Sequence, residues 1–103
     1  MDKVEFLILR NLLYNEEYVR KVLPFIKPEY FEDHNQKVVF EEIAKFVVEY
    51  NEPATKEVLC IETEKRQDIN DTSFKEITNL ISDLEDSPTE FNWLVDTTEK
   101  WCR

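Results

Sequence analysis

The side chains that could do chemistry are few, and their spacing does not assemble a catalytic or metal site. His34 is the single histidine, and no second histidine or glutamate lies at the spacing that holds a metal on a helix, because three residues earlier stands Phe31. Glu16–Glu17 and Glu41–Glu42 are adjacent acids, which diverge on a helix and so do not form a pair of catalytic carboxylates. We therefore predict a non-catalytic chain with no cofactor and no metal of its own.

Cysteine and glycine usage narrows the class further. Cys60 and Cys102 are far apart in the sequence, which indicates two free thiols in a reducing cytosol and no disulfide framework. The sequence has no glycine, so it contains no glycine-rich phosphate loop, and tight β-hairpins are disfavoured. The 103 residues suffice for one domain, which we predict to be all-α, a compact bundle of about six short helices.

The net charge of −10 argues against direct nucleic-acid binding by this chain. DNA and RNA are bound through clustered lysine and arginine, and here these residues are scattered. The acidity has two interpretations: it keeps a small domain in solution, or it faces a basic partner protein. No apolar run reaches membrane-spanning length and no secretory signal is present, so we expect a cytoplasmic protein without membrane contact.

The longest periodic segment, residues 33–51, predicts a central helix with one buried face. Asp33 is placed to cap its first turn, with Gln36 three residues later as a loose capping box. Asn51 ends the helix, and Pro53 forbids its continuation. The other elements would pack against this helix.

Capping residues and apolar periodicity predict five further helices, over residues 4–14, 15–23, 56–66, 73–84 and 88–103. Pro24 should end or kink the second of these near Leu23. In the connector 27–32, Pro28 suits the first position of one helical turn, and the aromatic residues Tyr30 and Phe31 would fill the gap between the second helix and the central helix.

Sequence signals also predict where the later helices begin and which faces they bury. Ser73 and Glu76 form a capping box, and Ser87 precedes Pro88 as the N-cap of the last helix. In helix 56–66 the inward residues would be Val58, Leu59 and Ile61. The predicted core consists of Phe6, Leu9, Leu13, Val22, Phe31, Phe40, Ile43, Val47, Ile77, Ile81, Leu84 and Leu94.

Two tryptophans on the last predicted helix are the candidate protein-interface residues. Trp93 lies roughly 100° around the helix from Leu94, off the apolar stripe. Trp101 stands near the end of a helix that has no stop signal, which would leave it exposed. The equally open interpretation of Trp93 is that it wraps over the rim of the core.

The order of several residue clusters resembles the N-terminal domain of ring-shaped replicative DNA helicases of the DnaB type, most of all those of T-even-like phages. Each cluster by itself is core or capping chemistry, whereas their order covers nearly the whole chain. The clusters are 21–25, 29–32, 39–43, 49–53, 80–82, 86–88, 93–95 and 98–100.

The resemblance implies a small helical bundle, residues 1–103, with the last helix 88–103 ending before a helical hairpin, a linker and a RecA-like motor. ATP and Mg²⁺ would be bound by that motor and not by this domain. The N-terminal domains would form a collar on a six-subunit ring, pair with copies of themselves, and help bind primase and a helicase loader in the host cytoplasm.

Two other functions fit the same residues. A helicase-binding C-terminal domain of a primase is similar in fold to the helicase collar, so the apolar pattern barely separates the two. A free-standing acidic phage protein could mimic DNA or regulate a host factor. A Walker motif beyond Arg103 would favour the helicase, and a natural stop there would favour the primase.

Overall fold

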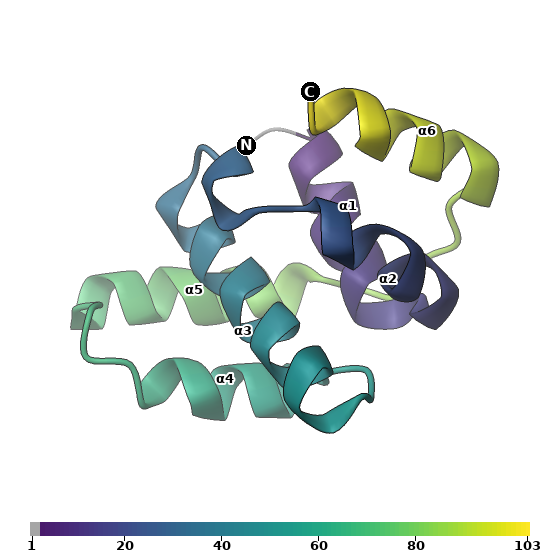
Figure 1. Cartoon of the computed structure of the whole chain (residues 1–103). Coiled ribbons are helices and arrows are strands. Elements are labelled where there is room, and N and C mark those ends of the chain that lie inside the picture. The colour runs from purple at the N-terminus through teal and green to yellow at the C-terminus, as the bar shows by residue number, and fades with distance from the viewer. Residues whose placement is uncertain (1–2) are drawn as a thin grey trace.

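Helices joined by short loops make up the computed structural model, which describes residues 3–103 (Figure 1). Within these residues there is no strand, so the all-α prediction is confirmed. The elements are α1 (Lys3–Tyr14), α2 (Glu16–Val22), η1 (Leu23–Phe25), η2 (Pro28–Tyr30), α3 (His34–Tyr50), α4 (Lys56–Glu64), α5 (Asp71–Asp83) and α6 (Phe91–Trp101), where η marks a single turn of 3-10 helix.

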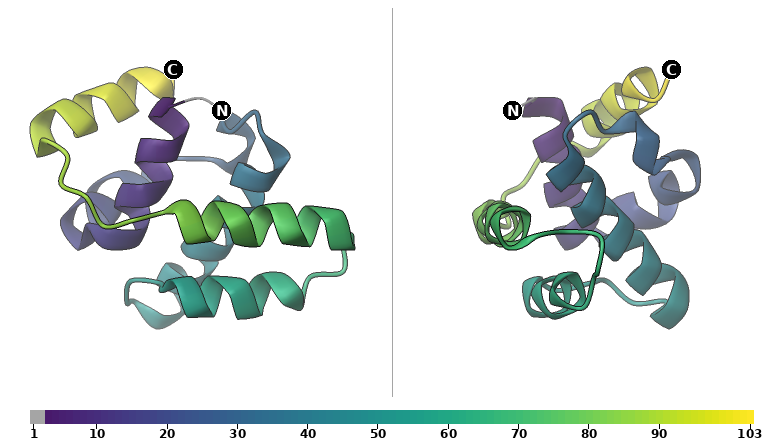
Figure 2. Two further views of the ribbon diagram at one scale, coloured as in Figure 1. Left: turned by 180° about the vertical axis from the view of Figure 1, so that it is seen from behind. Right: turned by 90° about the vertical axis from the view of Figure 1, so that its left-hand side faces the viewer.

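The central position of α3 is confirmed, because α1, α4 and α5 all pack against it. Figure 1 shows α4 and α5 side by side on one flank of α3, with α1, α2 and α6 towards the other end of the molecule. The right-hand view of Figure 2 shows the pair α4 and α5 end-on, with α3 lying across them. The radius of gyration of 12.8 Å is close to the value of about 13 Å expected for a folded chain of this length.

The ends of α3 are set by the residues that the sequence indicates. The Asp33 side chain accepts a hydrogen bond from the Asn35 backbone N–H at 2.7 Å, and Asn51 adopts the left-handed conformation that closes a helix, with φ of 54°. Gln36 does not complete a capping box, and that prediction is wrong. Its side chain is fully buried, and within residues 3–103 neither its Oε1 nor its Nε2 has a hydrogen-bond partner.

Proline ends α2 as predicted. The helix stops at Val22, and the chain continues as the 3-10 turn Leu23–Phe25 around Pro24. Pro28 then begins the second 3-10 turn, in the position that its missing amide favours.

Most of the predicted core is buried, and two of its members lie at the edge. Phe6 and Val47 are only partly buried against the core. The buried face of α1 centres on Ile8, Leu9 and Leu12, which leaves Phe6 at its margin, and Val47 borders a shallow depression near the end of α3. The buried members are Leu9, Leu13, Val22, Phe31, Phe40, Ile43, Ile77, Ile81, Leu84 and Leu94.

Helix α5 begins earlier than the capping box of Ser73 and Glu76 predicts. Asn70 is the N-cap, and its side chain accepts a hydrogen bond from the Ser73 backbone N–H at 2.8 Å. Asparagine is as good a cap as serine, and its position adds nearly a full turn to the helix.

Helix α6 begins later than the Ser87-Pro88 signal predicts, with Glu90 as its N-cap. The Glu90 carboxylate accepts from the backbone N–H groups of Asn92 and Trp93. Residues 84–90 form no helix and instead run past α1. Side chains of α1 hold this segment there: the Tyr14 hydroxyl donates to the Leu84 carbonyl at 2.8 Å, and Arg10 and Asn11 both donate to Thr89 Oγ1.

Candidate protein-interaction surface

Trp93 is the predicted interface residue that the structure leaves available. It lies on α6 and is 50% exposed, while Leu94 and Val95 beside it are buried. The opposite face of α6 is fixed by Tyr18 and Thr98, whose hydroxyl groups share a buried hydrogen bond of 2.6 Å. Burial raises the pKa of Tyr18, so this phenol stays protonated. These contacts hold α6 in place, with Trp93 on its exposed side.

Trp101 is only partly exposed and packs against the core, so the prediction that it would be left exposed is wrong. Its ring lies edge-on to Phe31, with ring centroids 4.9 Å apart, and to Tyr30 at 5.9 Å. Phe31 in turn packs on Phe40 at 5.2 Å. The aromatic residues of the connector therefore contact α6 as well as α3, and Trp101 completes their cluster from the other end of the chain.

The candidate metal ligands and the two thiols stay apart in residues 3–103. No group of three or more histidine, cysteine or acidic side chains there could hold a metal ion. Cys60 and Cys102 are free and part-buried, and burial raises the pKa of both thiols, which opposes the thiolate form that a nucleophile needs. No helix in the same residues is both long and apolar enough to cross a membrane.

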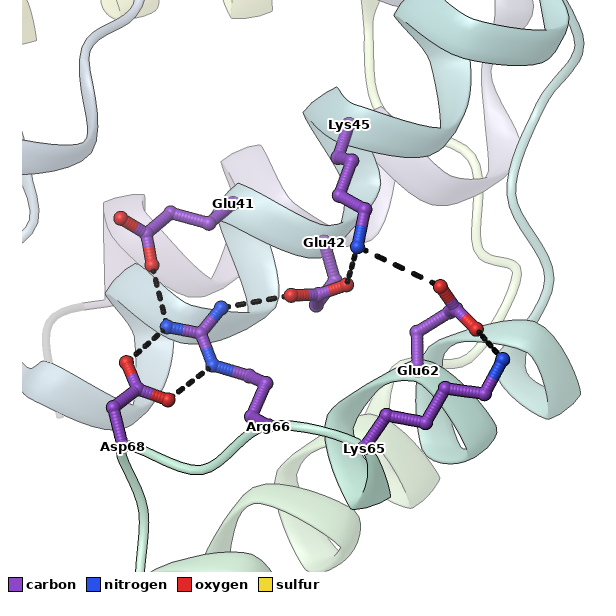
Figure 3. A network of polar contacts seen from close by, with 7 residues as sticks. All are labelled: Glu41, Glu42, Lys45, Glu62, Lys65, Arg66 and Asp68. Atoms are coloured by element: carbon purple, nitrogen blue, oxygen red, sulfur yellow. Dashed lines mark hydrogen bonds and ion pairs between the residues drawn. The ribbon is translucent and has the colours of Figure 1, made fainter.

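A network of charged side chains joins the end of α4 to α3 (Figure 3). Arg66 donates to Glu42 at 2.7 Å, to Glu41 at 3.1 Å and to Asp68 at 2.6 Å. These bonds, the one to Asp68 above all, raise the pKa of the guanidinium, and Arg66 lowers the pKa of Asp68. The Glu42 side chain is only 4% exposed. Arg66 therefore neutralises a buried carboxylate and ties α4 to α3.

The network continues through two lysines, as Figure 3 shows. Lys45 lies between Glu42 and Glu62, at 3.8 and 3.6 Å. Lys65 pairs with the other oxygen of Glu62 at 2.8 Å, which lowers the pKa of Glu62 and raises that of Lys65. Sequence reasoning missed this network because its members come from α3, from α4 and from the loop after α4.

A groove of about 460 Å³ lies between α3 and α4 beside this network. Its apolar lining comes from Phe46, Tyr50, Val58 and Ile61. Ile61 was predicted to point inward, and that prediction is wrong: it is 49% exposed, because α4 buries the face of Leu59 and Thr63 instead. Other exposed large apolar side chains are Tyr14, Phe25, Val48, Tyr50 and Trp93.

Comparison with known families gives the chain its context. A family model described as the DnaB-like helicase N terminal domain matches residues 2–93. The chain belongs to this family. The DnaB-like N-terminal domain is a non-catalytic region of a helicase. The match ends at Trp93, so the aromatic contact of Trp101 lies beyond it.

A relative extends the DnaB-like match over nearly the full chain. The DnaB-like replicative helicase of Enterobacteria phage T4 is 35% identical over 97 residues, which cover 94% of this chain. The matched region is 20% of that helicase, so the chain spans about a fifth of the relative's length. No solved structure matches the chain.

Proposed function

We propose that this chain is the N-terminal assembly and protein-interaction domain of a phage replicative helicase, a hexamer in which it contributes to the ring collar and contacts primase and the helicase loader. The observation that carries the proposal is Trp93, a half-exposed tryptophan on a helix whose other face is anchored by Tyr18 and Thr98. Tryptophan is the residue most enriched among energetically dominant interface positions. The identity to the T4 replicative helicase supports the helicase over the primase interpretation.

In this proposal the charge of the domain indicates what it binds. The domain carries a net charge of −10 and contacts proteins: copies of itself, primase and a loader. DNA, ATP and Mg²⁺ belong to the motor domain of the parent helicase. The assembly would work in the cytoplasm of the host cell.

A titration of primase with the full-length helicase that contains this domain tests the proposal. Trp93→Ala should weaken primase binding or ring assembly about tenfold or more, as truncation of a central interface tryptophan does. Val48→Ala is the matched control, because Val48 is also exposed but lies on α3. Anisotropy would report the affinity for primase, and sedimentation velocity would report the hexamer. Wild-type values for Trp93→Ala in both measurements would overturn the assignment of this surface.

A further inference from the structure

We propose that the α3–α4 groove is a docking site for a basic amphipathic helix of a partner protein. This surface is separate from Trp93, which lies on α6, and it adds a binding site that the proposed function does not require. The proposal rests on three features: the exposed apolar floor of the groove, the exposed glutamates on the two helices that form it, and its aromatic pair.

The apolar floor is the first feature. Tyr50 is 58% exposed and Ile61 is 49% exposed, and they face the same groove from opposite helices. Phe46 and Val58 continue the floor between them. Helices that bind in grooves place one apolar stripe on such a floor, with residues at i, i+3, i+4 and i+7.

The charges around this floor select the occupant. Glu57, Ile61 and Glu64 follow one another at i, i+4 and i+7 on the exposed side of α4, and Glu49 lies on the α3 side. These three glutamates are exposed, and within residues 3–103 none of them takes part in an ion pair, whereas the lysines at the groove are already paired with Glu42 and Glu62. The free charge of the rim is therefore negative, and it is complementary to lysine and arginine.

The aromatic pair adds to the same preference. Phe46 and Tyr50 pack with ring centroids 4.7 Å apart, and Glu49 lines the same groove as the exposed Tyr50 ring. An aromatic face beside a carboxylate attracts a lysine or arginine side chain through both the ring and the charge.

A second copy of this chain is a poorer occupant. Each copy carries a net charge of −10, so a second copy brings little of the basic charge that would complement the acidic rim of this groove. The basic stretch of this chain that lacks acids, residues 20–27, has Val22 and Ile26 buried in its own core. Its Arg20 is already bound to Glu16 and Asn51. This stretch therefore has no free apolar helix face to offer.

The test uses the 103-residue chain and a labelled helical probe peptide of about 14 residues, or four turns, with leucine on one face and lysine on the others. The control peptide has glutamate in place of every lysine. Fluorescence anisotropy in about 0.15 M salt, which screens long-range attraction, measures the dissociation constant. Lysine-peptide binding without glutamate-peptide binding is expected.

Charge removal at the groove is compared with equal charge removal elsewhere. The triple variant Glu49→Gln, Glu57→Gln, Glu64→Gln should weaken lysine-peptide binding about tenfold, from three rim contacts of modest strength. The matched triple variant Glu17→Gln, Glu29→Gln, Glu32→Gln removes three exposed carboxylates that lie away from the groove and form no ion pair with residues 3–103. It should change the affinity for the lysine peptide less than about twofold.

The apolar floor has its own matched pair of variants. Ile61→Ser should weaken binding about tenfold through lost apolar contact, and Val48→Ser, exposed on another face of α3, should not. If the two triple charge variants lose equal affinity for the lysine peptide, the binding is a general attraction to an acidic protein and the proposal is overturned. Failure of the lysine peptide to bind would overturn it as well. Sedimentation that shows a dimer disrupted by Ile61→Ser would assign the groove to a second copy instead. None of these outcomes involves Trp93, so they leave the proposed function standing.

Discussion

Replacement of Arg66 by methionine should destabilise the fold far more than its place after the end of α4 suggests. Arg66 Nη1 donates to Glu42 Oε2 at 2.7 Å, and the Glu42 side chain is 4% exposed. After the substitution, the remaining cation near that carboxylate is Lys45, whose Nζ lies 3.8 Å from the other oxygen. The variant therefore leaves a buried carboxylate with a weakened partner.

The magnitude follows from the burial of each partner. Removing one member of a buried pair costs about 3–5 kcal/mol, because the other charge stays desolvated. The contacts of Arg66 to Glu41 and to the 58% exposed Asp68 add less than about 1 kcal/mol each. Since Lys45 still compensates in part, we expect Arg66→Met to lower the free energy of unfolding by about 3 kcal/mol, a large share of a total of roughly 5–15 kcal/mol.

Urea unfolding followed by circular dichroism at neutral pH measures this loss. Asp68→Asn is the control that keeps the buried contact, and it should cost at most about 1 kcal/mol. The double variant Arg66→Met, Glu42→Leu removes both buried charges and should recover to within about 1 kcal/mol of the wild type. The reasoning is refuted if Arg66→Met alone costs less than about 1 kcal/mol, or if the double variant is less stable than the single one.

Three further outcomes are expected. Trp101→Ala should lower the free energy of unfolding by about 2–3 kcal/mol, and Trp93→Ala should lower it by less than about 0.5 kcal/mol. The fluorescence of the Trp93→Ala variant, which comes from Trp101, should peak at a shorter wavelength than that of Trp101→Ala. Equal losses of stability in the two variants would contradict the burial assigned to the two tryptophans. Gln36→Leu should raise the free energy of unfolding by about 1–2 kcal/mol, because neither buried amide atom has a hydrogen-bond partner within residues 3–103. The melting temperature should rise accordingly, and a lower melting temperature would contradict this. The pKa values of Asp68 and Glu62 are lowered in the fold, so the unfolded chain binds more protons than the folded chain as the pH falls. The free energy of unfolding should therefore decrease below about pH 4.5, which thermal melts between pH 7 and 3 would measure. A melting temperature that does not change over this range would contradict the prediction.

What could be predicted from the sequence is largely what neighbouring residues decide. Asp33 and Asn51 were correctly predicted as the two ends of the central helix, because capping is a local hydrogen bond or a local backbone conformation. Pro24 ended α2 for an equally local reason. The all-α fold followed from the lack of glycine and from helical periodicity, neither of which depends on distant contacts.

The wrong predictions concern residues whose structure is decided by contacts with distant parts of the chain. The Ser87-Pro88 signal is a good local helix start, but hydrogen bonds from α1 to Leu84 and Thr89 hold that segment out of the helix. Trp101 was predicted to be exposed because its helix has no stop signal. The prediction failed because its partner ring, Phe31, lies some 70 residues earlier in the sequence, where a local pattern does not show it. The α3–α4 groove was harder to predict from the sequence. Ile61 fits an inward-facing stripe in the sequence, and only the position of α5 shows that α4 turns its other face to the core.

The ion-pair network and the α3–α4 groove are connected by the position of α4. Without Arg66 and Lys45, α4 would be held to α3 mainly by Leu59 and by its contacts with α5. The network closes the side of the groove with paired charges and fixes the separation of Tyr50 from Ile61 before any partner arrives. A groove fixed in advance costs a bound helix little ordering of the receptor.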